Sequence, residues 1–198
     1  MKRCFDIVFA LLMLPVLLPI IGVLWMLARR DGGPGFFVQP RIGRHGKVFN
    51  CWKMRTMVVD AEAALRKMCE EDPVKAHEWH VNQKLIDDPR ITRIGKFLRA
   101  TSLDELPQIF NVLTGDMSFV GPRPFLIDQE ELYRDAGGKW YFNMRPGITG
   151  LWQVEGRNAT SFVERVGYDN RYFRGLSLSR DMGLLVRTVS VVFKRTGK

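Results

Sequence analysis

The sequence predicts an α-rich α+β protein with two parts, an N-terminal re-entrant membrane hairpin over residues 1–30 and a globular domain over residues 31–198. Three observations predict this class. An uncharged apolar run starts at Ile7 and ends at Ala28. Beyond it, apolar residues recur mainly at helical spacing, which predicts amphipathic surface helices. Two short runs of strand character flank a glycine-containing turn, which predicts a small β-hairpin.

The apolar run predicts a helix-break-helix segment. About twenty apolar residues suffice to cross a hydrocarbon core of about 30 Å, but Pro15 and Pro19 interrupt this run, and proline disrupts a helix interior. Basic pairs stand at both ends, Lys2-Arg3 and Arg29-Arg30. Positive residues stay on the cytoplasmic side, so a hairpin that enters and leaves by the cytoplasmic face is favoured over a kinked span. A signal peptide is disfavoured because no small-residue cleavage site follows the run.

The composition narrows the class of partner. Aromatic residues at 11% and charged residues at 26% are typical of a globular chain and not of a disordered one. The net charge of +9 indicates an anionic partner: nucleic acid, an acidic membrane surface or a phosphorylated substrate. No recognition-helix or zinc-finger pattern is present, so nucleic acid is not expected. Cys4, Cys51 and Cys69 are odd in number and lack paired spacing, which favours a reducing compartment over a disulfide framework.

Residues 36–39 and 47–55 read as strands on either side of the turn at residues 44–46. In the second strand, alternation places Lys53 and Arg55 on one face that is otherwise apolar. Two cations on such a face need an anion or solvent. Both are therefore predicted to face a phosphate site.

Helices are predicted from Asp60 to Cys69, from Pro73 onward, around Ile94–Arg99, and from Leu106 to Leu113 with a stop at Gly115. The third is basic and amphipathic, a pattern typical of a helix on an anionic membrane, beside a phosphate site or simply in solvent. In the second helix His77 and His80 lie three residues apart. A solvated helix face is favoured there over a metal site, because no further ligands stand nearby.

Asp104 and Glu105 are the candidate reactive residues. Two interpretations remain open from spacing alone. Ser102 and Glu105 have the spacing of a helix capping box, or Asp104 itself caps the helix that Pro107 begins. Alternatively, the pair forms part of a catalytic site.

Four arginines favour the catalytic interpretation. Arg99, Arg123, Arg145 and Arg157 lie in or beside glycine-rich, proline-rich or helix-start segments. Such segments present arginines and backbone N–H groups to anions, and the guanidinium fork suits phosphate oxygens. Carboxylates and arginines without a thiol or a Ser/His pair favour phosphoryl transfer, usually with Mg²⁺. An ionised aspartate can also act as the nucleophile.

These motifs occur together in one known family. The sequence resembles the bacterial sugar transferases called monotopic phosphoglycosyl transferases, and within them the undecaprenyl-phosphate galactose phosphotransferases and related exopolysaccharide-initiating enzymes. The stretches that carry the resemblance are Lys2-Arg3 with Phe5-Asp6, residues 41–47, residues 53–57, residues 88–92, Thr101–Pro107, residues 115–124 and Arg145–Gly150.

The resemblance implies a mechanism. Asp104 would attack the β-phosphorus of a UDP-sugar and release UMP, and undecaprenyl phosphate would then take the sugar phosphate from the aspartate. Glu105 would support the nucleophile, and the two carboxylates would hold Mg²⁺. The resemblance also assigns Arg99, Arg123 and Arg157 to the phosphates or nucleotide, Asp181 to the neighbourhood of the site, and Pro19 to the kink of the re-entrant helix.

The resemblance further implies a place in the cell: the cytoplasmic face of the bacterial inner membrane, among membrane lipids. The motifs do not identify the sugar, and galactose or glucose is expected only because the resemblance lies with hexose phosphate transferases. A homodimer is compatible with the resemblance. Many members carry serine before the kink proline, whereas this chain has Leu18 there and a second proline, Pro15. The chance that the chain is a non-catalytic adaptor binding acidic lipids stays open at this point. The sequence also leaves open whether this chain is a whole protein or one part of a larger one.

Overall fold

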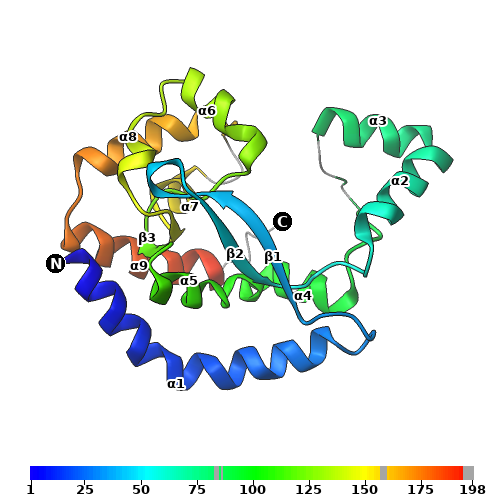
Figure 1. Cartoon of the computed structure of the whole chain (residues 1–198), viewed down its shortest axis with the longest axis horizontal. Helices are drawn as coiled ribbons and strands as arrows, with labels where there is room; N and C mark the ends of the chain where they lie inside the picture. The colour runs from blue at the N-terminus through cyan, green and yellow to red at the C-terminus, as the bar shows by residue number, and fades with distance from the viewer. Residues whose placement is uncertain (83–84, 86, 157–159, 194–198) are drawn as a thin grey trace.

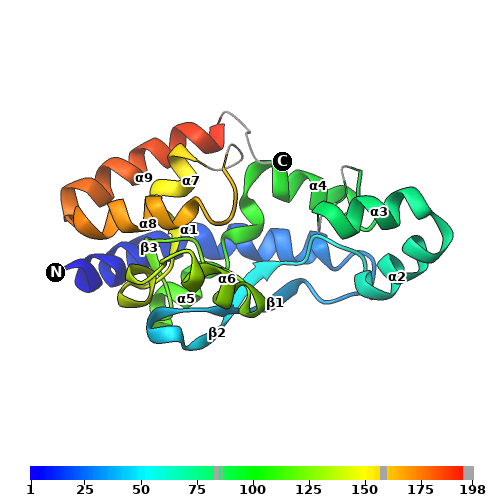
Figure 2. The same ribbon diagram turned by 90° about the horizontal axis from the view of Figure 1, so that it is seen from above.

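The computed structural model describes residues 1–82, 85, 87–156 and 160–193. Helices dominate it, and the strands form two small sheets, so the predicted α-rich α+β class is confirmed (Figures 1 and 2). In chain order the elements are α1 (Lys2–Ala28), β1 (Phe36–Ile42), the 3-10 helix η1 (Arg44–Gly46), β2 (Val48–Met54), α2 (Ala61–Glu71), α3 (Pro73–Asn82), α4 (Arg93–Thr101), the 3-10 helix η2 (Leu103–Glu105), α5 (Gln108–Thr114), β3 (Ser118–Val120), the 3-10 helix η3 (Ile127–Gln129), α6 (Glu130–Asp135), the 3-10 helix η4 (Trp140–Asn143), β4 (Gly147–Thr149), α7 (Leu151–Glu155), α8 (Arg165–Arg174) and α9 (Leu178–Phe193).

The predicted β-hairpin is present. β1 and β2 pair antiparallel from Phe36 opposite Met54 to Ile42 opposite Val48. His45 lies in the left-handed region at φ 61° within the connecting turn. β1 continues past Gln39 to Ile42, because proline is tolerated on an edge strand such as this one.

A second sheet was not predicted. β3 and β4 pair parallel, with Ser118 opposite Gly147 and Val120 opposite Thr149. β4 lies within Arg145–Gly150, which composition alone marks as a loop. Strands of three residues are too short to show an alternating pattern, so this sheet leaves no periodic signal in the sequence.

The apolar run forms one long helix. α1 stays helical from Lys2 to Ala28 with Pro15 and Pro19 inside it, and Figure 1 shows it bending as it passes along one side of the molecule. The predicted break is therefore a bend within a continuous helix, because a proline removes one hydrogen bond and kinks the axis without unwinding its neighbours.

α1 has two unlike sides. Ala10, Ile21, Leu24 and Ala28 are buried in the main hydrophobic core. The outer side is apolar and exposed, through Ile7, Val8, Leu11, Leu12, Val16, Leu18, Ile20, Val23 and Met26. By length and composition α1 could cross a membrane, with a mean hydropathy of 2.9 over an 18-residue window. Leucines and valines on the outside of a helix are typical of contact with lipid.

Polar contacts join the start of α1 to the globular body. The guanidinium of Arg3 donates to the carbonyl oxygens of Val112 at 2.6 Å and Leu113 at 3.0 Å. These carbonyls belong to the last turn of α5, where a cation is favoured by the helix dipole. The buried carboxylate of Asp6 accepts from the Ser118 hydroxyl at 2.9 Å. The N-terminal turn of α1 is thus bound to both α5 and β3.

A second, aromatic core lies beside the main one. Phe125 is fully buried, with its ring centroid 4.7 Å from that of Tyr133 and 4.5 Å from that of Tyr141. The Tyr141 hydroxyl donates to the carbonyl of Ile42 at the end of β1. This core supports the segment after β3, which carries Arg123.

Candidate active site

Asp104 and Glu105 lie in η2, a single turn between α4 and α5. Ser102 ends α4 in the left-handed conformation, at φ 57°, and its side chain caps no helix. Pro107 occupies the N-cap position of α5, which has no side-chain cap. The capping interpretation is therefore wrong, because no side chain caps η2 or α5, and both carboxylates are available for other partners.

Two cations converge on Glu105. Lys53 Nζ lies 3.0 Å from Glu105 Oε1, and an Arg123 terminal nitrogen lies 2.9 Å from the same oxygen. Asp104 is held more loosely, since its Oδ2 is 3.9 Å from Lys53 Nζ. Within the described chain, Asp104 and Oε2 of Glu105 accept no hydrogen bond.

The two carboxyl groups differ in acidity. Burial raises the pKa of Asp104, the charge of Glu105 raises it further, and Lys53 opposes both. Burial also acts to raise the pKa of Glu105, but the charges and hydrogen bonds of Arg123 and Lys53 outweigh burial and hold that pKa well below its usual range. Glu105 is thus the fixed anion of the pair, and Asp104 is the more basic carboxylate.

Asn111 of α5 sets the position of β2 beside the carboxylates. Its side-chain oxygen accepts from the Trp52 N–H at 3.0 Å, and its side-chain nitrogen donates to the Asn50 carbonyl at 2.7 Å. Because the Asn111 amide both donates to and accepts from the main chain of β2, it fixes the position of β2 along α5. Lys53 follows Trp52 and is thereby held over η2.

Arg99 also lies near the pair. Its Nε donates to the Thr56 hydroxyl at 2.9 Å, and the Asp104 charge acts on its guanidinium. Thr56 is in turn fixed by Thr92, whose N–H donates to the Thr56 carbonyl at 3.0 Å. The structure therefore brings Lys53 and Arg123 into contact with the carboxylates and places Arg99 close enough to feel the Asp104 charge. That these cations bind a phosphate stays a prediction.

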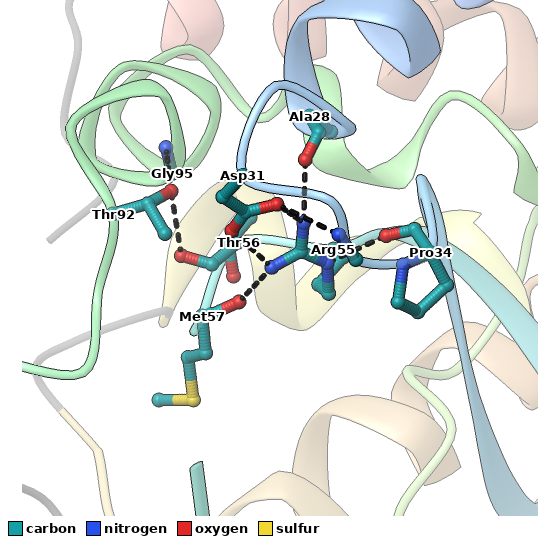
Figure 3. A network of polar contacts seen from close by, with 9 residues as sticks. Ala28, Asp31, Pro34, Arg55, Thr56, Met57, Thr92 and Gly95 are labelled. Carbon is teal, nitrogen blue, oxygen red and sulfur yellow. Dashed lines mark hydrogen bonds and ion pairs between the residues drawn. The ribbon is translucent and has the colours of Figure 1, made fainter. Parts of the chain in front are cut away.

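Arg55 does not reach the carboxylates, which corrects the prediction that it faces a phosphate. Figure 3 shows its guanidinium enclosed by other partners. Its N–H groups donate to the carbonyls of Ala28, Pro34 and Met57 and to both carboxylate oxygens of Asp31. β2 ends at Met54, so strand alternation no longer sets the direction of the next side chain. Arg55 instead ties the C-terminal end of α1 to the end of the hairpin.

Two further predicted residues lie elsewhere, and a third is not described. Arg145 donates to the carbonyl of Gly115, the residue that ends α5, at 2.8 Å. Asp181 is buried and accepts from Lys2 and, at 2.6 Å, from the Tyr172 hydroxyl. It therefore joins α9 to the first turn of α1 rather than serving the carboxylates. Arg157 lies outside the described residues.

A pocket opens beside the carboxylates. Its lining includes residues that the sequence pattern did not single out, and the full set is Arg41, Cys51, Lys53, Glu105, Gln108, Arg123, Pro124 and Gly147. Burial raises the pKa of the Cys51 thiol, which keeps this thiol protonated and unsuited to nucleophilic attack. Arg41 of β1 lies opposite Phe49 of β2. Residues opposite one another in an antiparallel pair share a face, so Arg41 is on the same side of the hairpin as Phe49, Cys51 and Lys53.

Comparison with known proteins identifies the family of the chain. The model of the bacterial sugar transferase family matches residues 1–195. The chain belongs to this family. It is 46% identical over its whole length to the undecaprenyl-phosphate galactose phosphotransferase of Salmonella typhimurium, of which it covers 41%. It is 42% identical over 96% of its length to the exopolysaccharide production protein ExoY of Sinorhizobium fredii, of which it covers 84%.

A third relative is the UDP-glucose:undecaprenyl-phosphate glucose-1-phosphate transferase of Escherichia coli. The identity is 40% over 96% of the chain, which covers 39% of that protein. The chain thus spans about two fifths of the length of the Salmonella and Escherichia relatives and most of the length of ExoY.

We expect Arg55→Ala to destabilise the fold without specifically weakening substrate binding. It would leave the carbonyls of Ala28, Pro34 and Met57 without their donor, and each buried unsatisfied acceptor costs about 1–3 kcal/mol. Thermal unfolding in lipid nanodiscs measures the loss, with the exposed Arg30→Ala as a control expected to change little. An Arg55→Ala protein of normal stability but reduced substrate affinity would show that Arg55 binds substrate.

Proposed function

We propose that this chain catalyses transfer of a hexose 1-phosphate from a UDP-hexose to undecaprenyl phosphate, with release of UMP. Family membership and the printed activities of the Salmonella and Escherichia relatives support this reaction class. The observation that carries the proposal is the unequal binding of the two carboxylates: Glu105 is fixed by two cations, whereas Asp104 accepts no hydrogen bond from the described chain.

This inequality supports Asp104 as the nucleophile. An Asp104 oxygen attacks the β-phosphorus, the bond from that phosphorus to the bridging oxygen breaks, and the electron pair leaves with UMP. Carboxylate basicity matters because a more basic oxygen is the better nucleophile, and burial beside Glu105 raises the pKa of Asp104. Lys53 and Arg123 neutralise charge around the phosphoryl group as it transfers.

The second step reverses the first on a new acceptor. An oxygen of undecaprenyl phosphate attacks the phosphorus of the aspartyl phosphosugar, the bond to Asp104 breaks, and the carboxylate is restored. Phosphate oxygens are already ionised, so no general base is needed for this attack. The pocket lining within the described chain has no Ser or His, and burial keeps its thiol, Cys51, protonated, which accords with a carboxylate as the nucleophile.

Magnesium fits the donor set as a cofactor shared with the substrate. No cluster of three or more His, Cys, Asp or Glu side chains that could hold a metal lies within the described part of the chain. Mg²⁺, however, commonly takes one or two carboxylates and completes its shell with water and substrate phosphates. Asp104 and Oε2 of Glu105 are the oxygens that would hold it, and when bound it would neutralise diphosphate charge.

The setting we infer is the cytoplasmic face of the bacterial inner membrane, with α1 re-entrant. Both ends of α1 are bonded to the same globular body, through Arg3 at the start and through Arg55 to Ala28 at the end. A helix of 27 residues is about 40 Å long, but ends tied to one polar body cannot stand on opposite sides of a bilayer. The exposed apolar side of α1 then rests in one leaflet.

The adaptor interpretation finds less support. It requires the carboxylate pair to serve as a helix cap, and neither carboxylate caps a helix. A half-buried acidic pair enclosed by cations and opening on a pocket is more typical of a catalytic site.

We expect the purified chain in nanodiscs containing undecaprenyl phosphate and Mg²⁺ to release UMP from UDP-galactose or UDP-glucose. Asp104→Asn removes the nucleophile with little change in volume and should lower this rate by a factor of about 10³ or more. Arg44→Gln, on the exposed turn of the hairpin, should keep the wild-type rate. Unchanged turnover in Asp104→Asn, or no UMP from any UDP-hexose, would contradict the proposed reaction.

The pH profile tests which carboxylate reacts. Asp104 must be ionised to attack, so kcat/KM should fall as the pH drops through its raised pKa, above the usual aspartate value of about 3.9. Because Lys53 lowers and Glu105 raises this pKa, Lys53→Met should move the acidic limb to higher pH and Glu105→Gln should move it to lower pH. Shifts in the same direction in both variants would argue against Asp104.

Cysteine labelling tests the re-entrant arrangement. In a Cys69→Ser background, the exposed Cys4 reports on the start of α1, and Cys4→Ser with Arg30→Cys reports on its end. A membrane-impermeant maleimide should label both variants in inside-out vesicles and neither in sealed right-side-out vesicles. Labelling of the two positions from opposite sides would show that α1 spans the membrane.

A further inference from the structure

The pocket beside Glu105 has more positive charge than its carboxylates balance. Arg41, Lys53 and Arg123 line it, and Glu105 is the carboxylate among its lining residues. Lys53 and Arg123 are both paired with Glu105. Arg41 feels the Glu105 charge but forms no ion pair with a carboxylate of the described chain.

Arg41 is held in place but not neutralised. A terminal nitrogen of its guanidinium donates to Gln39 Oε1 at 2.6 Å, and within the described chain no carboxylate lies at ion-pair distance from it. Burial, followed by the charges of Arg123 and Arg165, lowers the pKa of the Arg41 guanidinium. A half-buried cation with cationic neighbours is costly unless an anion joins it.

A further arginine, Arg165, lies near Arg41 and Arg123 and adds to the positive potential there. It is buried, donates to the Arg123 main-chain carbonyl, and stacks on the Trp152 ring with 4.7 Å from Cζ to the centroid. Its Nε is buried and has no hydrogen-bond partner among the residues that the structure describes. Arg165 thus holds the Arg123 segment in place, and its charge, which also interacts with Asp169, acts on Arg41.

We propose that Arg41, together with Arg123, binds the phosphate that remains on the nucleoside, and so stabilises the leaving group. This proposal rests on the proposed function and extends it to a residue of β1. The reacting phosphorus must lie within reach of Asp104, whereas Arg41 lies in the pocket on the Glu105 side of the pair. When the β-phosphorus of the substrate lies at Asp104, Arg41 therefore contacts the α-phosphate, which stays on the nucleoside.

The UMP leaving group gains negative charge during the reaction. When Asp104 attacks, the bond between the β-phosphorus and the bridging oxygen breaks, and its electron pair stays on that oxygen as part of UMP. The added negative charge needs a donor that is already positioned, and no proton has to be transferred. A guanidinium offers two parallel N–H donors to a phosphate, which an ammonium does not.

Binding of UMP and of uridine, measured by calorimetry on the full chain in nanodiscs, tests the proposal. The ratio of the two affinities isolates the contribution of the phosphate. In Arg41→Gln this ratio should fall roughly tenfold or more, as expected for loss of a hydrogen bond to a charged group. Arg41→Lys should recover part of it, and Arg44→Gln, in the turn that follows β1 and exposed, should leave the ratio unchanged.

The outcomes separate this proposal from the proposed function. An unchanged ratio in Arg41→Gln would overturn the role of Arg41, and so would a parallel loss of UMP and uridine binding with a lower melting temperature. Failure of the wild-type chain to bind UMP or UDP at all would count against the proposed function itself. A reduced ratio with normal uridine binding supports the assignment.

Discussion

The ion pairs of Glu105 with Lys53 and Arg123 are the interaction on which the site depends. Two adjacent carboxylates in a half-buried turn repel one another, and burial makes each ionised form costly. Both cations bind one oxygen of one carboxylate, so Glu105 stays ionised while the pKa of Asp104 is raised. These two ion pairs thus help to give two neighbouring acids different acidities.

Much of the fold places these three side chains. Lys53 comes from β2, which Asn111 joins to α5, and Arg123 comes from the segment after β3, which the Phe125 aromatic core supports. The long helix α1 is bound at its start to α5 and β3 and at its end to Arg55. The same contacts that seat α1 on the body therefore also fix the position of the turn with Asp104 and Glu105 relative to the exposed apolar side of α1.

Features that depend on local periodicity and composition could be predicted from the sequence. The apolar run, the hairpin, and the helix that ends at Gly115 follow from local patterns. Strand alternation placed Lys53 on the same side of β2 as Cys51, where it contacts Glu105. The same alternation failed for Arg55, because β2 ends one residue earlier. Loop composition did not separate Arg123 from Arg145, because which of them meets the carboxylates is decided by tertiary contacts. The orientation of Arg41 likewise depends on strand register and on the pocket behind it.

The most direct test of the central claim is the mass of a covalent intermediate. The chain is incubated with a UDP-hexose in the absence of undecaprenyl phosphate, digested, and sequenced by tandem mass spectrometry. A peptide carrying one hexose phosphate on Asp104, formed together with an equivalent of UMP and lost on adding undecaprenyl phosphate, is the expected result. An adduct on Glu105, or UMP release that requires undecaprenyl phosphate and leaves no adduct, would contradict the assignment of these two carboxylates.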